Sequence, residues 1–243
     1  MNYDESALQR VREDRLLIDR CDAWLFEEIE PFLGQRILEV GCGLGNLARL
    51  LRDRELYIGI DSCGESVSVL QTQYVNDSNM KFLCMDVTDP SVDGLGNHRL
   101  DTVVSMNVFE HIDDDVIALR QVCRLLQPDG WLVLVVPAHD FLYGTMDRAI
   151  GHCRRYTKAS MARKMAAAGL RVHEQKYLNA LGALGWFVNG RILRQPVPPS
   201  NQLRAFNKIV PIVQKMERIV KSPIGISLLT IAKREGNADG CNG

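Results

Sequence analysis

The chain has 243 residues and a formal net charge of −1, and 46% of its residues are hydrophobic. These values are those of an ordinary globular protein: one α/β domain with insertions, or a domain with a small cap. No run reaches about 18 uninterrupted apolar residues, so we expect no membrane-spanning helix. The N-terminus, M-N-Y-D-E-S, has no apolar segment typical of a secretory signal, and the seven cysteines form no C-x-x-C pair. We therefore predict a cytoplasmic protein with reduced thiols and no metal site.

The net charge hides an asymmetry between two parts of the chain. Residues 1–142 hold 12 Lys/Arg against 25 Asp/Glu, whereas residues 143–243 hold 17 against 5. One interpretation is that the two parts attract each other or a partner subunit. The other is an acidic part that suits a cationic cofactor and a basic part that meets an anionic substrate or a membrane surface. The charges alone leave both interpretations open.

Residues 5–30 place apolar side chains at helical spacing, and Pro31 and Gly34 end the pattern, so residues 1–35 are predicted to form a helical cover. Strands and helices then alternate. The expected strands are residues 36–40, 56–60, 81–85, 102–106 and 131–136, and the expected helices are 46–54, 65–75 and 113–126, with a turn at 128–130. Near-continuous apolar strands separated by helices predict a parallel sheet covered on both faces, with its strand carboxyl ends at one edge.

After Pro137 the pattern changes. The expected elements are a polar loop at 138–157, a basic helix at 158–168 and strands at 170–177 and 226–233. Glycines, prolines and an amphipathic segment fill residues 178–223, and residues 235–243 have the composition of a disordered tail. The predicted organisation is a helical segment 1–35, a core 36–137, a C-terminal part 138–234 with a substrate loop and a cap, and the tail.

The most informative stretch is residues 37–47, which read I-L-E-V-G-C-G-L-G-N-L. An apolar strand runs into glycines at alternate positions, Gly41, Gly43 and Gly45, and a helix-like segment follows. Glycine allows a positive φ angle and lets a ligand lie against bare backbone. The stretch therefore predicts a site for a nucleoside-like cofactor.

Three acids accompany this turn. Asp61 ends the second strand, where a carboxylate can accept both hydroxyls of a ribose. Glu39 could hold a ligand ammonium group, and Asp86 ends the third strand, where it could bind an adenine amino group. Dinucleotide-binding enzymes share the acid after the second strand, but their turn is G-x-G-x-x-G, whereas this one is G-x-G-x-G. Acids at three strand ends suit a ribose, an amine and a sulfonium better than a pyrophosphate.

Five motifs then carry a family resemblance, in order: E-V-G-C-G-L-G-N, Y-I-G-I-D, C-M-D-V, L-D-T-V-V-S-M-N-V-F-E-H-I and L-Q-P-D-G-W-L-V-L-V-V-P. In these motifs, residues 36–137 resemble class I S-adenosylmethionine-dependent methyltransferases, and within that class the methyltransferases of types 11 and 12. The resemblance implies an α/β, Rossmann-like sheet of seven mostly parallel strands, with the last strand antiparallel and inserted between the fifth strand and residues 170–177.

The same resemblance implies S-adenosyl-L-methionine as cofactor and S-adenosyl-L-homocysteine as product. The implied cofactor-binding residues are Glu39, Gly41, Gly43, Asp61, Ser62, Asp86, Val87 and Asn107. Methyl transfer is an in-line displacement that needs an aligned nucleophile and, if this carries a proton, a base. The catalytic candidates are His139, His111 and Tyr143, because a base should lie just beyond strands four and five. For His111 the alternative is a role in packing or in starting a helix, and for His139 a role in its loop.

The loop L-Y-G-T-M-D-R-A-I-G-H-C-R-R-Y-T, residues 142–157, concentrates polar side chains. The candidate substrate-binding residues are Tyr143, Asp147, His152, Arg154, Arg155 and Tyr156. They could form a clamp for an anionic or sugar-like acceptor, because guanidinium groups match carboxylate and phosphate forks. Alternatively, an Arg–Asp pair docks the loop. The pattern D-x-x-x-G-H-x-R-R-Y, followed by a basic helix, resembles one bacterial subgroup of these methyltransferases, which leaves the acceptor open.

Residues 203–221 form an amphipathic, basic helical pattern around Pro211. Packing in a cap or homodimer is one interpretation. The other is contact with an anionic membrane, with Trp186 and Phe187 as anchors.

The leading hypothesis is a methyltransferase acting on an oxygen or nitrogen of a small polar metabolite that is anionic or contains a sugar. The alternatives are a membrane-surface methyltransferase of a lipid-linked sugar or prenyl compound, and a non-catalytic, cofactor-binding partner subunit. A nucleic-acid partner is disfavoured, because strand four ends in S-M-N-V and not in the N-P-P-Y or D-P-P-F of amino-methylating nucleic-acid enzymes.

Overall fold

The structure is a computed structural model that describes residues 15–220 and 222–235. Its contacts divide the chain into two compact units. The helical unit comprises Met1–Glu30, Val136–Lys158 and Lys176–Leu229, and the sheet unit comprises Pro31–Val135, Ala159–Gln175 and Thr230–Gly243. The C-terminal part, residues 138–234, contributes to both units, because its two strands join the same sheet as the preceding five.

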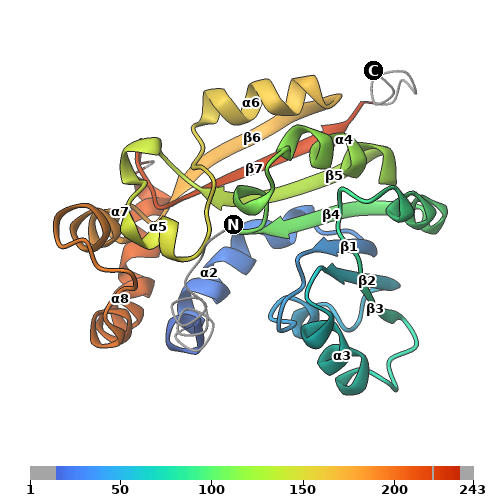
Figure 1. The fold of residues 1–243 in the computed structure, drawn as a ribbon, viewed down its shortest axis with the longest axis horizontal. Helices are drawn as coiled ribbons and strands as arrows, with labels where there is room; N and C mark the ends of the chain where they lie inside the picture. Colours follow the sequence, from blue (N-terminus) through green and yellow to red (C-terminus); the bar gives the residue numbers. More distant parts are fainter. Residues whose placement is uncertain (1–14, 221, 236–243) are drawn as a thin grey trace. The chain divides into compact units, whose positions relative to one another are not determined.

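Seven strands form one sheet in the order β3-β2-β1-β4-β5-β7-β6 (Figure 1). Their bounds are β1 Arg36–Val40, β2 Leu56–Asp61, β3 Met80–Cys84, β4 Leu100–Met106, β5 Leu126–Pro137, β6 Leu170–Leu178 and β7 Ser227–Arg234. Six strands are parallel and one is antiparallel. The last strand lies between β5 and β6, so the predicted Rossmann-like topology is confirmed.

Apolar runs explain the central strands. Ile37, Leu38, Ile58 and Val103 have no exposed surface, as expected for parallel strands covered on both faces. Burying each such side chain stabilises the fold by roughly 1.5–3 kcal/mol. The register is fixed on both sides of β1, where Leu38 pairs with Ile58 of β2 and with Val103 of β4.

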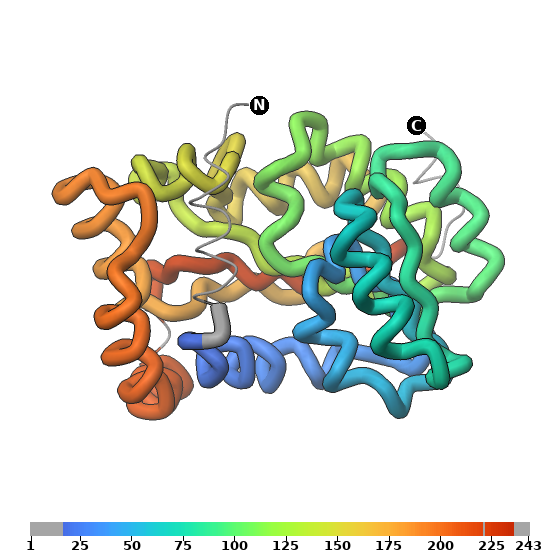
Figure 2. The backbone as a smooth tube through the Cα atoms, turned by 60° about the horizontal axis from the view of Figure 1, so that its bottom comes forward, coloured from blue at the N-terminus to red at the C-terminus, as the bar shows by residue number. Residues whose placement is uncertain are grey.

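The α-helices are α2 Asp19–Ile29, α3 Gly64–Gln73, α4 Asp115–Leu125, α5 Thr145–Ala149, α6 Lys158–Ala167, α7 Ala180–Phe187 and α8 Ser200–Ile219. Shorter helical turns are η1 Arg15–Ile18, η2 Glu30–Phe32, η3 Ala48–Leu50, η4 Pro90–His98, η5 Phe109–His111, η6 Asp140–Leu142 and η7 Val188–Ile192. Figure 1 shows α3 beside β3, and Figure 2 shows α8 beside α2, which is far away in the sequence. An acid caps α4: the Asp114 carboxylate accepts a hydrogen bond from the backbone N–H of Ile117 at 3.1 Å.

Two local predictions were wrong. The helix expected at 46–54 is only the 3₁₀ turn η3, in which Leu50 N donates to Leu47 O and Leu51 N to Ala48 O. So short a segment gains too few bonds to offset the entropy cost of starting an α-helix. The turn expected at 128–130 lies inside β5, where Asp129 has a φ of 62° and the pairing with β4 shifts register.

Two predicted segments lie partly outside the residues that the structure describes. The beginning of the predicted helical cover, residues 1–14, and residues 236–243 of the predicted tail lie outside the described residues. Within the described ranges, no helix is both long and apolar enough to cross a membrane. The Cys42 and Cys84 side chains are thiols, as expected.

Candidate functional site

The sheet unit brings four parallel strand ends together. β3, β2, β1 and β4 are parallel neighbours, so their carboxyl ends lie along one edge of the sheet. In doubly wound sheets, ligands bind in the crevice outside this edge. The glycine turn follows β1, Asp61 ends β2, Asp86 follows β3 and Asn107 follows β4. The structure therefore places the predicted cofactor-binding residues at one edge of one unit.

The glycine turn is formed by left-handed backbone. Gly41 has a φ of 81°, and a Cβ there would lie 2.2 Å from Cγ2 of Val108, so only glycine fits. Gly43 has a φ of 49°, but a Cβ there would meet no described atom within 4 Å. Packing therefore explains Gly41, while Gly43 borders open space in which a ligand can lie against the backbone.

Asp61 links β2 to this turn. One carboxylate oxygen, Oδ2, accepts a hydrogen bond from the backbone N–H of Gly43 at 2.8 Å, and Oδ1 accepts one from Cys63 N at 2.9 Å. Each carboxylate oxygen has two lone pairs, so each can accept one further hydrogen bond. The side chain is held rigidly and can still accept two donors, which fits the two hydroxyls of a ribose.

Glu39 is a buried carboxylate inside β1, with only 4% of its surface exposed. The hydroxyl of Tyr57, on the neighbouring strand, donates a hydrogen bond to its Oε2. Burial, followed by the charge of Glu39, raises the pKa of Tyr57 well above its usual value of 10.0, so the phenol keeps its proton. Burial and the charge of Glu39 likewise raise the pKa of the Cys42 thiol. Tyr57 was not among the predicted site residues, because its only signal in the sequence is an aromatic hydroxyl in a strand expected to be buried.

Tyr57→Phe is expected to destabilise the sheet unit by about 1–3 kcal/mol, because it removes a donor from a buried carboxylate. Urea unfolding measures this change. Tyr74→Phe is the matched control, since no hydrogen bond of its hydroxyl is seen in the described part of the chain. If Tyr57→Phe is as stable as the wild-type protein, the hydrogen bond from Tyr57 to Glu39 does not stabilise the fold.

The remaining predicted cofactor residues are arranged as follows. Oδ1 of Asp86 accepts hydrogen bonds from the backbone N–H and the hydroxyl of Thr88, both at 2.8 Å, while Val87 is buried. Ser62 is exposed. Asn107 has a φ of 56°, a left-handed conformation that asparagine tolerates better than most residues, and its N–H donates to Val135 O at 2.8 Å. Such strained positions are often retained where function requires them. The specific cofactor contacts of all these residues stay predictions.

His139 lies two residues after β5, in the helical unit. Its φ is 62°, a rare conformation for a residue with a side chain, and its N–H donates to Tyr156 O at 2.8 Å. The imidazole packs against the rings of Tyr177 and Phe141, with centroid distances of 4.2 and 5.2 Å. Burial, with a contribution from the charge of Arg155, lowers its pKa from the usual 6.5, while Asp140 opposes the shift. Nε2 is buried and has no hydrogen-bond partner among the described residues.

Asp147 is the centre of a buried network in the 142–157 loop. Its fully buried carboxylate accepts hydrogen bonds from Nε of Arg155 at 2.7 Å, from Nε1 of Trp186 at 3.0 Å and from Gly144 N at 2.9 Å. Nδ1 of His152 lies 3.0 Å from Oδ1. Burial alone would raise the pKa of Asp147, but these donors outweigh it and lower the pKa to about 2.

Arg155 completes this network. Its guanidinium also donates to the backbone oxygen of Ala138 at 2.9 Å and lies 5.1 Å from the ring centroid of Trp186. Only 4% of Arg155 is exposed. The Arg–Asp pairing is the arrangement expected if these residues dock the loop. Trp186, considered above as a membrane anchor, donates its indole N–H to this network.

The other acceptor-side candidates lie outside the hydrogen bonds of Asp147 and Arg155 described above. Tyr143 donates its hydroxyl to His152 O at 2.8 Å, and burial, then Asp147, raises its pKa, which disfavours it as a base. His111, in the sheet unit, ends η5, and its N–H donates to Val108 O at 2.9 Å, in keeping with a helical-turn role. Arg154 is half-buried, and Tyr156 is buried with its N–H on Pro137 O. Acceptor binding by the residues of this loop stays a prediction.

Comparison with known proteins identifies the family to which this chain is similar. A protein-family model described as a methyltransferase domain matches residues 10–175. The ubiquinone biosynthesis O-methyltransferase of Paracidovorax citrulli is 29% identical over 110 residues, which are 45% of this chain and 46% of that protein. The malonyl-(acyl-carrier protein) O-methyltransferase of Acetivibrio thermocellus is 27% identical over 141 residues, 57% of this chain and 46% of that protein. Each match thus spans about half of the relative's length.

Solved structures show the same fold. The structure of an S-adenosylmethionine dependent methyltransferase from Mesorhizobium loti superimposes with a TM-score of 0.58 at 14% identity, covering 87% of this chain and 98% of that one. At this identity the similarity is evidence for the fold alone.

Proposed function

Since the chain belongs to the methyltransferase-domain family, we propose that it transfers the methyl group of S-adenosylmethionine to an oxygen of a small polar metabolite that is anionic or contains a sugar. The family and the fold imply S-adenosylmethionine as methyl donor. Both relatives described above are named O-methyltransferases, which supports oxygen as the acceptor atom. Residues 143–243 carry 12 more Lys/Arg than Asp/Glu residues, and this excess of positive charge supports an anionic acceptor.

The observation that carries this proposal is the geometry of Asp61. Its carboxylate is fixed by Gly43 N and Cys63 N and keeps two acceptor positions. Gly43 leaves open space beside it, and the Glu39 carboxylate lies buried in the strand before the turn. These residues therefore fit a ligand that carries a ribose and a positive charge. In this assignment Asp61 holds the ribose hydroxyls and Glu39 attracts the cationic methionine moiety.

When bound, S-adenosylmethionine supplies a methyl group activated by its sulfonium. An acceptor hydroxyl must lose its proton as its oxygen bonds to the methyl carbon, while the carbon–sulfur bond electrons stay on sulfur. The protein has to align the acceptor and remove this proton. We assign proton removal to His139. Its lowered pKa keeps the imidazole neutral at physiological pH, and its buried Nε2 has no hydrogen-bond partner in the described part of the molecule. A neutral imidazole nitrogen can accept a proton.

His139→Asn tests this assignment. Asparagine tolerates the positive φ of this position, so the backbone is expected to be retained. Turnover is expected to fall about 10²–10⁴-fold, with cofactor affinity unchanged, because a positioned base contributes that factor. The turnover rate of the wild type should fall as the pH drops through the pKa of His139, which lies below 6.5, because the imidazole then gains a proton. This decrease at acidic pH should be absent from the pH–rate profile of the variant. Turnover within a few-fold of the wild type would exclude His139 as the base.

The reaction itself is tested with S-adenosylmethionine carrying an isotope-labelled methyl group, incubated with the protein and a small-molecule extract. We expect the label in a low-molecular-weight product, with the NMR chemical shift of an O-methyl carbon. Fractionation on an anion-exchange column should retain the unmethylated acceptor if it is anionic. A label found on nitrogen, or only in macromolecules, would contradict the proposal.

A further inference from the structure

One face of helix α8, its inner face, packs against other elements of the helical unit. The helix packs against α2 and η1, and Val210 is buried there. The single acid of the helix, Glu217, accepts hydrogen bonds from the backbone N–H groups of Asn179 and Ala180 at 2.9 and 2.7 Å. Gln214 and Arg218 bind Glu27 of α2. These contacts fix which side of α8 faces the unit.

The opposite side of α8 exposes an apolar row. Ile209, Ile212, Met216 and Ile219 are 40%, 62%, 62% and 85% exposed. Their spacings of three and four residues place them on one side of an α-helix, and Ala205 begins the same row. Large exposed apolar side chains in a contiguous row are unusual on a soluble surface and mark an interaction site.

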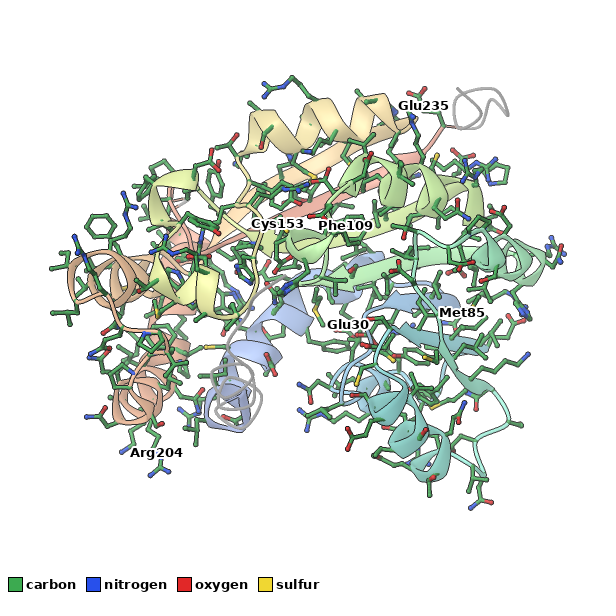
Figure 3. All side chains as sticks on the ribbon, viewed as in Figure 1. Glu30, Met85, Phe109, Cys153, Arg204 and Glu235 are labelled. Atoms are coloured by element: carbon green, nitrogen blue, oxygen red, sulfur yellow. The ribbon has the colours of Figure 1, made fainter. Side chains whose placement is uncertain are left out.

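A basic row runs beside the apolar one. Arg204, Lys208 and Lys215 each precede a member of the apolar row by one residue, which corresponds to about 100° around the helix. Arg204 lies on α8 in Figure 3, with its side chain directed outward. Arg191 and Arg194 precede α8, together with the exposed Ile192 and Leu193. Residues 180–220 thus hold six basic residues and one acid, and of these Glu217 and Arg218 are bound on the inner side.

We propose that this face of α8 docks on a membrane surface that contains anionic lipids. Such a surface supplies an apolar layer for the isoleucines and methionine and negative charge for the adjacent basic row. A second copy of the chain would bring the same basic row and no acids to this face, so its charges would repel. No described helix could cross the bilayer, so the contact is peripheral. This inference goes beyond methyl transfer and does not depend on it.

Vesicle co-sedimentation of the full chain tests the proposal. The probes are vesicles of phosphatidylcholine alone and of phosphatidylcholine with phosphatidylglycerol. We expect binding to the anionic vesicles only, weakened by added salt. Ile212→Glu with Ile219→Glu should abolish it. Lys208→Gln with Lys215→Gln should weaken it roughly 30-fold, which corresponds to about 1 kcal/mol for each charge removed. Val75→Glu, at a 74% exposed position of the sheet unit, is the matched control and should bind as the wild type does.

Cofactor affinity and thermal unfolding, measured for each variant, show whether the fold is retained. Equal binding to neutral and anionic vesicles, or undiminished binding of the double glutamate variant, would overturn the proposal. Sedimentation velocity without vesicles tests whether a second copy of the chain covers this face instead. A dimer that the double glutamate variant dissociates would show that a second copy covers this face, and this result would also overturn the membrane proposal.

Discussion

Asp61→Ala is expected to abolish binding of S-adenosylmethionine, with an affinity at least about 100-fold lower than that of the wild type. The charge-assisted hydrogen bonds that a carboxylate accepts contribute about 1.5–3 kcal/mol each, and the variant would lose two of them to the ribose. Isothermal titration calorimetry with S-adenosylmethionine and S-adenosylhomocysteine measures the change directly. Unchanged affinity would refute the assignment of Asp61 to the ribose.

The control for this experiment must separate ligand contact from folding. Asp61 also holds Gly43 N and Cys63 N, so its removal loosens the turn. Asp61→Asn keeps the shape of the side chain but replaces one acceptor oxygen with a donor, and it should bind the cofactor weakly while unfolding near the wild-type temperature. Asp53→Ala removes an exposed acid of the same unit and should leave both properties unchanged.

Asp147→Asn is expected to destabilise the helical unit by about 3–5 kcal/mol, because it removes the buried negative charge that accepts a hydrogen bond from the guanidinium of Arg155. Denaturant unfolding measures the loss. Asp140→Asn, at an exposed position of the turn η6 just before this loop, is the matched control and should change stability little. A loss below about 1 kcal/mol would show that the network does not hold the loop.

The pH dependence of unfolding gives a second readout of Asp147. Its pKa is lowered from 3.8 to about 2 in the folded protein, so the folded state favours the ionised form. The stabilisation is fully present above the unfolded pKa and is lost as the pH falls through about 2. The wild type should therefore lose about 2 kcal/mol between pH 4 and pH 2 through this group, and Asp147→Asn should lack this component.

Much of the sheet could be predicted because its strands are continuous apolar runs bounded by glycines, prolines and acids. Strand β1 has the predicted bounds, and the parallel topology then places Asp61 and Asn107 at one edge of the sheet. Residues 46–54 illustrate the limit of this reasoning. Their apolar spacing fits a helix, but the segment is too short for spacing alone to distinguish an α-helix from a 3₁₀ turn.

The contacts that complete the site depend on long-range packing, which composition and spacing do not reveal. Tyr57 reaches Glu39 from a neighbouring strand, and the sequence contains nothing that pairs the two. In the loop, six polar residues occur close together, and only the structure shows that Asp147 and Arg155 point into a buried network. His139 combines a positive φ with contacts to Tyr156 and Tyr177, which lie 17 and 38 residues further along the chain.

We expect the turn between β1 and β2 to hold the adenosyl moiety of the methyl donor. A structure determined with S-adenosylhomocysteine bound is the decisive experiment. We predict both ribose hydroxyls within hydrogen-bond distance of the Asp61 carboxylate, with the ligand lying against Gly43. A nucleoside bound elsewhere, or a ribose that does not contact Asp61, would contradict the claim.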